Sequence, residues 1–170
     1  MQGDPEPEFS REIAAEEIPP TGRTVDLAPT AGERAALADR LGLVDLTALH
    51  FRGQVRPWRK HGLTLEGTLK AALVQSCVVT LEPVAETIDE AVKLHFLPED
   101  LIERDERRRQ RNEEREIVFD LDAEDPPEPM YNGRIDMGEA IAEQLALLMN
   151  PYPRAPGADF SLETPPEGKL

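Results

Sequence analysis

Hydrophobic positions recur with a period of two along the middle of the chain, which is the spacing of a β-strand with one buried face. Between residues 43 and 58 the alternation places Phe51 and Val55 on one face and charged side chains on the other. The same spacing returns at 63–73 and again at 84–96. Three successive runs separated by short turns predict an antiparallel meander with one polar face.

Two segments carry the helical period instead. Thr30 and Glu33 form the capping-box pattern at the start of residues 31–41, where each side chain can satisfy a backbone N–H of the other. Asp136 stands at the N-cap position of a second apolar stripe, over residues 137–149. We therefore expect two helices, each with its first turn fixed by a side-chain cap.

Together these elements predict a single α+β domain over residues 9–153. Its antiparallel sheet has about five strands, two of them short strands ahead of the first helix, and the second helix is C-terminal. The segment 99–129 is charged and proline-broken, and we expect it to be partly irregular. Residues 1–8 and 154–170 are rich in proline and polar side chains, which predicts disordered ends.

The charge balance limits the kinds of partner that the protein can bind. The chain of 170 residues carries 34 acidic against 19 basic side chains, a net charge of −15. A basic footprint across the whole fold is therefore absent, and any RNA contact needs a local basic patch. Long-range attraction favours a basic protein partner. We see neither a signal peptide nor a membrane-spanning apolar stretch, so we expect a cytoplasmic protein with no membrane partner.

The first candidate site is the hairpin around residue 60. Arg52, Arg56 and Trp58 share the polar face of one strand, and Arg59 and Lys60 follow in the turn. Guanidinium groups pair with phosphate and an exposed ring can stack on a base, so this pattern is typical of RNA contact. The alternative is a solvated face on which the tryptophan covers an edge of the core.

A second basic stripe exists if residues 103–116 are helical. In that case Arg104, Arg108, Arg111 and Arg115 lie along one face. The same segment holds as many acidic residues as arginines, and pairs four residues apart can neutralise one another. Self-paired arginines bind phosphate less readily, so the sequence favours a solvated helix over a second RNA site.

The sequence contains no recognisable set of catalytic residues. Cys77, the only cysteine, shares parity with the buried face of its strand, where burial would raise the pKa of the thiol and blunt its reactivity. A single cysteine also excludes an internal disulfide and a multi-cysteine zinc site. Asp120 and Asp122 leave open a metal-dependent hydrolase, although a charge run in a proline-broken loop is typical of a solvated segment. We therefore predict no catalytic residues, no metal and no cofactor.

Two motifs in combination carry a family resemblance. The first, "SCVVTLEP", contains Cys77, Leu81, Glu82 and Pro83, and the second, "NGRIDMGEAIAEQLALLMNPYPR", contains Asp136. Over about residues 10–157 the chain resembles the YceD family, bacterial and plastid proteins that are also classed as a domain of unknown function.

The resemblance implies a role in the accumulation of 23S ribosomal RNA, without known catalysis. It implies ribosomal RNA or a pre-ribosomal particle as partner, and also a basic large-subunit ribosomal protein, whose gene often lies nearby. Many members have a second cysteine where this chain has Thr80, and further cysteines near the C-terminus. In lacking them the chain is similar to alphaproteobacterial members, and any metal role of those cysteines is lost.

The sequence thus predicts a non-enzymatic ribosome-biogenesis factor that supports 23S ribosomal RNA synthesis, processing or accumulation by binding RNA or a pre-ribosomal particle. The basic hairpin would make the contact while the acidic remainder disfavours indiscriminate RNA binding. The alternative is an acidic protein-binding module that holds a basic ribosomal protein without touching RNA.

Overall fold

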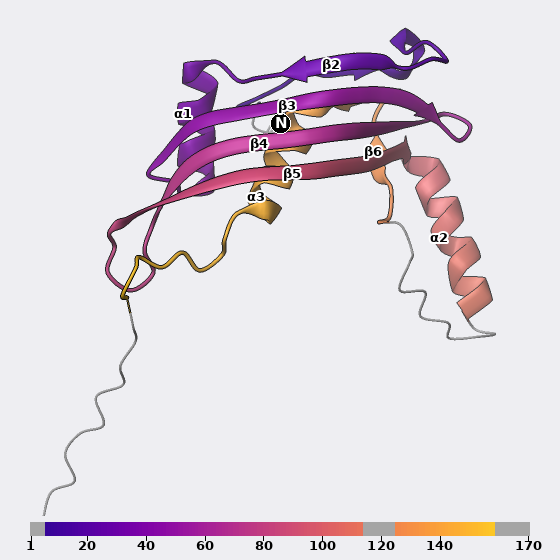
Figure 1. Ribbon diagram of the computed structural model, residues 1–170. Helices are drawn as coiled ribbons and strands as arrows, with labels where there is room; N and C mark the ends of the chain where they lie inside the picture. Colours follow the sequence, from indigo (N-terminus) through magenta and orange to yellow (C-terminus); the bar gives the residue numbers. More distant parts are fainter. Residues whose placement is uncertain (1–5, 114–124, 159–170) are drawn as a thin grey trace, which may run out of the picture.

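The architecture is a long, curved sheet with helices at its ends and against one face (Figure 1). The computed structural model describes residues 6–113 and 125–158. The main sheet has the strand order β2-β3-β4-β5-β6, with every pair antiparallel except β5 and β6. Its strands are β2 (Arg23–Leu27), β3 (Asp45–Trp58), β4 (Gly62–Ser76), β5 (Pro83–Pro98) and β6 (Glu128–Met130).

A second, two-stranded antiparallel sheet joins the two ends of the domain. It pairs β1 (Glu12–Ala14) with β7 (Arg134–Asp136). A short 3-10 helix, Ala15–Glu17, follows β1. The predicted α+β class with a five-stranded, mostly antiparallel sheet is confirmed.

Three α-helices accompany the sheets in the described part of the chain, and the two predicted from periodicity begin and end close to the expected residues. They are α1 (Ala31–Leu41) and α3 (Met137–Leu148). The third, α2 (Glu99–Glu113), lies in the charged segment that we expected to be partly irregular. Leu101 and Ile102 of its first turn are half-buried, and the helix extends away from the end of β5 (Figure 1).

The core lies between one face of the sheet and the helices α1 and α3. Phe51 of β3 and Leu65 of β4 are fully buried, together with Leu37 of α1 and Leu145 of α3. Burial of each such side chain stabilises the fold by about 1.5–3 kcal/mol. The strands alternate as the sequence predicts, so the opposite face of the sheet is polar.

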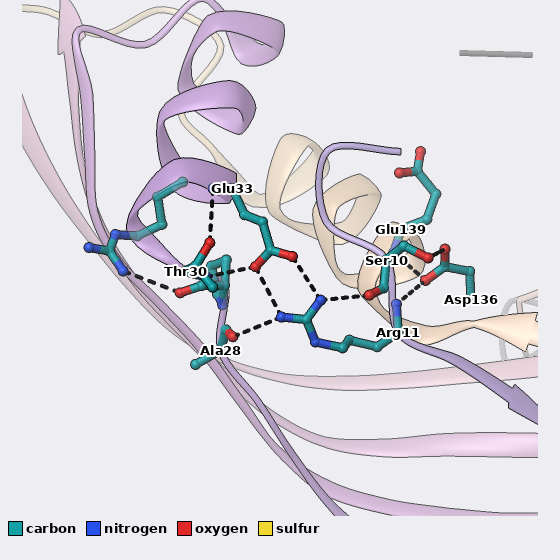
Figure 2. Close-up of polar contacts among 9 residues, drawn as sticks. Ser10, Arg11, Ala28, Thr30, Glu33, Asp136 and Glu139 are labelled. Atoms are coloured by element: carbon teal, nitrogen blue, oxygen red, sulfur yellow. Dashed lines mark hydrogen bonds and ion pairs between the residues drawn. The ribbon is translucent and has the colours of Figure 1, made fainter. Parts of the chain in front are cut away.

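One polar network fastens the N-terminal segment to both α1 and α3 (Figure 2). The Arg11 guanidinium donates to both carboxylate oxygens of Glu33, at 2.8 and 3.0 Å, while Glu33 also accepts from the Thr30 N–H at 2.7 Å. Asp136 accepts from the Ser10 hydroxyl at 2.6 Å and from the Arg11 N–H at 2.8 Å. The capping box of α1 and the N-cap of α3 are thus joined through one arginine.

Residues at both ends of the domain make contacts in segments that we expected to be disordered. Glu8 forms an ion pair with Arg40 at 2.9 Å, although it lies in the segment predicted to be disordered. Ala155, in the predicted disordered tail, is buried and donates its N–H to the sulfur of Cys77 at 3.2 Å. No helix within the two described segments is long and apolar enough to cross a membrane.

Candidate nucleic-acid interface

The tip of the β3–β4 hairpin is a three-residue turn, Arg59–His61, closed by the pairing of Trp58 with Gly62. Arg59 has a φ of 50° and His61 a φ of 74°, both in the left-handed region. That conformation costs roughly 1–2 kcal/mol for a residue with a Cβ atom. The cost implies that contacts of the turn with its surroundings hold it in place.

Trp58 provides those contacts and is half-buried by them. Its ring stacks on the His95 imidazole with 4.2 Å between ring centroids, and the Arg59 guanidinium carbon lies 4.2 Å from the indole centroid. Two groups this close cannot share one face of a ring, so one covers each face. The prediction that Trp58 offers a face to a base is therefore not supported by the geometry.

The hairpin arginines differ in how far their charge is neutralised. Arg59 forms an ion pair with Asp105 of α2 at 3.3 Å, which ties the hairpin tip to that helix. Arg52 lies 3.6 Å from Asp26 of β2, with both side chains largely exposed. Arg56 is exposed, and among the described residues it donates only to the Gln54 amide oxygen, at 3.0 Å.

The remaining hairpin cation and the arginines of α2 stay open to solvent. Lys60 is exposed and, among the described residues, has no ion-pair partner. The same holds for Arg104, Arg108 and Arg111, whereas Arg107 pairs with Glu103 at 3.0 Å. Arg115 lies outside the described residues. The expected pairing four residues apart is present between Glu103 and Arg107, while partners of the later arginines beyond residue 111 lie outside the described side chains.

Four arginines of α2 gather on one face of the helix. Spacings of three and four residues bring Arg104, Arg107, Arg108 and Arg111 onto one face, where they alone line a hollow of about 280 Å³. Glu99, Glu103 and Glu106 follow one another at the same spacings along a different face. Because Asp105 binds Arg59, α2 passes beside the hairpin tip.

Cys77 is buried, as predicted, but it is not a strand residue. It opens the β4–β5 loop, one residue after β4 ends, and its sulfur accepts N–H hydrogen bonds from Ala155, Val79 and Thr80 at 3.2–3.4 Å. These bonds, first that of Ala155 and then those of Thr80, lower the pKa of the Cys77 thiol to about 6. Burial does raise the pKa of this thiol, as we expected, but the hydrogen bonds to the thiolate outweigh that contribution, so the expected net direction is wrong. Nothing in the sequence indicated that the backbone of Ala155 would reach this loop.

The other residues of the family motifs build turns and helix ends. Cys77 and Glu82 are joined by a backbone hydrogen bond of 2.7 Å across the loop, while Leu81 has a φ of 62° and an exposed side chain. Pro83 is the first residue of β5, and Asp136 caps α3. Across 6–113 and 125–158 there is no group of three or more His, Cys, Asp or Glu side chains that could hold a metal.

The geometry therefore defines an α+β protein in which a hairpin tip and an arginine-lined face of α2 belong to the same end of the sheet. The model of the family described as "Large ribosomal RNA subunit accumulation protein YceD" matches residues 65–169, more than half of the chain. The chain belongs to that family. The match starts within β4, so β2, α1 and β3 precede it, whereas our resemblance began near residue 10. No curated protein and no solved structure gives a significant match.

Proposed function

We propose that this protein supports 23S ribosomal RNA accumulation in the cytoplasm as a non-enzymatic factor that binds ribosomal RNA or a pre-ribosomal particle. The family to which it belongs is named for large-subunit ribosomal RNA accumulation. The observation that carries the RNA contact is the hollow on α2 lined by four arginines, because guanidinium groups at this spacing suit the phosphates of an RNA backbone.

The contact we propose runs from the hairpin tip along α2. Lys60 and Arg56 on the hairpin, and Arg104, Arg108 and Arg111 on the helix, carry charges that no described acid neutralises. Trp58 takes no part as a stacking platform, since His95 and Arg59 cover its two faces. Recognition would therefore rest on phosphate position and RNA shape rather than on stacked bases.

The net charge of −15 fits this arrangement. Polyanions approaching the rest of the surface are repelled, so only RNA that reaches the basic end in a suitable orientation gains attraction. The protein would then bind weakly to arbitrary RNA and better where backbone phosphates present a matching curve.

The test is RNA binding by fluorescence anisotropy with transcripts of large-subunit ribosomal RNA. A triple variant, Arg104→Gln/Arg108→Gln/Arg111→Gln, should lose most of its affinity at low salt. A control variant that removes three exposed cations elsewhere, Arg23→Gln/Lys70→Gln/Arg154→Gln, should bind within about twofold of the wild type. Equal binding by the triple variant and the wild type would refute the proposed interface.

The alternative function, an acidic module that holds a basic ribosomal protein without RNA contact, makes a different prediction. Ribosomal proteins captured from lysate would then remain bound after RNase digestion, and the triple variant would capture as much as the wild type. Loss of capture after RNase would favour the RNA-binding function.

A further inference from the structure

Large apolar side chains are exposed together at the end of the sheet opposite to the hairpin tip. In the β4–β5 loop Leu81 is 77% and Val78 51% exposed, and Tyr152 is 72% exposed. The Val78 N–H donates to the Pro153 carbonyl at 2.9 Å, which brings the segment of Tyr152 alongside the loop (Figure 1). Val44, 58% exposed, donates its N–H to the backbone of β4 at 2.8 Å, near the same end. Four of the six large apolar side chains that are exposed in the described part of the chain thus lie at one end of the sheet.

The loop holds Leu81 in a conformation that a leucine rarely adopts. Its φ of 62° lies in the left-handed region, which glycine and asparagine tolerate better. Hydrogen bonds fix the loop, since the Cys77 N–H donates to the Glu82 carbonyl at 2.7 Å and the Leu81 N–H to the Cys77 carbonyl at 3.0 Å. The fold gains little in return from a leucine that is mostly in water. Backbone strain at an exposed apolar residue is typical of a binding site, and a loop fixed in advance loses little entropy when it binds.

The charges at this end of the sheet select the kind of partner. Asp45, Glu82 and Glu86 lie beside the exposed apolar side chains, against one arginine of the C-terminal segment, Arg154. Among the side chains that the structure describes, none of the three acids has an ion-pair partner. These acids would repel RNA or an anionic membrane, and a second copy would bring the acids of two loops together. A basic protein surface would be attracted instead.

We propose that the apolar end, which we define as Val44, Val78, Leu81 and Tyr152, binds an apolar pocket on the surface of a basic protein. The full length of β4, about 45–50 Å at a rise of about 3.3 Å per residue, separates it from the hairpin tip. The molecule would therefore hold RNA at one end of the sheet and a protein at the other. The proposal rests on the proposed function only for the source of the partner, which is the pre-ribosomal particle.

The first test is a photocrosslink from the apolar end. The protein with p-benzoylphenylalanine in place of Val78 is irradiated together with the proteins extracted from large ribosomal subunits and freed of RNA. We expect a crosslink to a basic protein of this extract. A crosslink to residues 159–170 of the same chain, to a second copy or to an acidic protein would overturn the proposal, and so would the absence of any crosslink.

The variant Leu81→Asn separates binding from folding. Because asparagine tolerates the left-handed conformation, the urea midpoint should rise. The concentration of extract that gives half-maximal crosslinking from position 78 should rise at least about tenfold. The control Leu147→Gln removes a leucine of α3 that is 76% exposed and should leave crosslinking unchanged. A lower urea midpoint for Leu81→Asn would mean that the leucine supports the fold, and equal loss of crosslinking in both variants would mean unspecific apolar attraction; either result would contradict the proposal.

The two ends of the sheet can be tested independently of one another. Leu81→Asn should bind ribosomal RNA as the wild type does, and Arg104→Gln/Arg108→Gln/Arg111→Gln should crosslink as the wild type does. RNA binding without a crosslink that depends on Leu81 would refute this inference and leave the proposed function intact. A crosslink that depends on Leu81, without RNA binding, would refute the RNA contact alone and support the apolar end.

Discussion

The ion pair between Arg11 and Glu33 is expected to raise the free energy of unfolding by a measurable amount. Glu33 sits where the N-terminal segment meets α1 (Figure 2), and its carboxylate accepts from Arg11 and from the Thr30 N–H. These bonds, that of Arg11 first, lower the pKa of Glu33 from its usual 4.5 to about 2.

The size of the effect follows from that shift. Each pKa unit corresponds to about 1.4 kcal/mol of preference for the charged form, so a shift to about 2 sets an upper bound near 3.4 kcal/mol. The Glu33 side chain is 24% exposed, and solvent screening reduces the net contribution to about 1–2 kcal/mol. Since the pKa is lowered in the folded state, this stability is full above pH 4.5 and is lost as pH falls towards 2.

The perturbation is Glu33→Gln, which keeps an oxygen for the Thr30 N–H and removes the charge that Arg11 binds. Urea unfolding followed by circular dichroism should show a loss of about 1–2 kcal/mol at pH 7 and a much smaller loss near pH 2. The control is Glu12→Gln, which breaks an exposed 3.4 Å pair with Arg134 and should cost under about 0.5 kcal/mol. A loss that is the same at both pH values would refute the reasoning, as would a double-mutant cycle with Arg11→Met that gives no coupling.

Three further predictions test other parts of the structure. Because His95 and Arg59 cover both faces of Trp58, the only tryptophan, saturating RNA should leave its fluorescence nearly unchanged, and strong quenching would show base stacking. Gly138→Ala should destabilise the protein by about 1–3 kcal/mol in urea unfolding, because the added Cβ would meet the Phe9 carbonyl oxygen. The control Gly32→Ala, on α1 where a Cβ has room, should stabilise the protein by about 0.5–1 kcal/mol. The opposite order of stabilities would contradict the packing. Because its pKa is lowered to about 6, the Cys77 thiol should stabilise the fold fully above pH 9 and lose this effect as pH falls towards 6. The urea midpoint of Cys77→Ala should therefore lie further below that of the wild type at pH 9 than at pH 6. A difference that stays constant with pH would argue against the N–H bonds to the sulfur.

Local patterns in the sequence were sufficient for most of the fold. The alternation through Phe51 and Val55 and the capping box at Thr30 can both be read from residues close together in the chain, and both are found as predicted. The helix α2 was harder to predict, because a segment with few apolar residues gives no periodic signal. Only the folded chain shows that Leu101 and Ile102 near its start are half-buried.

The candidate site depends on contacts that the sequence does not encode locally. Arg59 and Asp105 are 46 residues apart, and no pattern indicates that they pair. Trp58 has a polar-face position, yet His95 from β5 stacks against it and removes it as a base-stacking platform. The exposure of Arg52 and Arg56 on one face of β3 follows from the alternation, whereas the contacts of Trp58 and Arg59 come from distant parts of the chain.

The salt dependence of RNA binding tests the central claim most directly, because it reports how many phosphates the protein neutralises. For single-stranded RNA the logarithm of the binding constant falls with the logarithm of salt by about 0.7 per phosphate contact. If Arg104, Arg108 and Arg111 each contact a phosphate, their removal should lower the slope by about 2, while the Arg23→Gln/Lys70→Gln/Arg154→Gln control leaves it unchanged. An identical slope for the triple variant and the wild type would contradict the account.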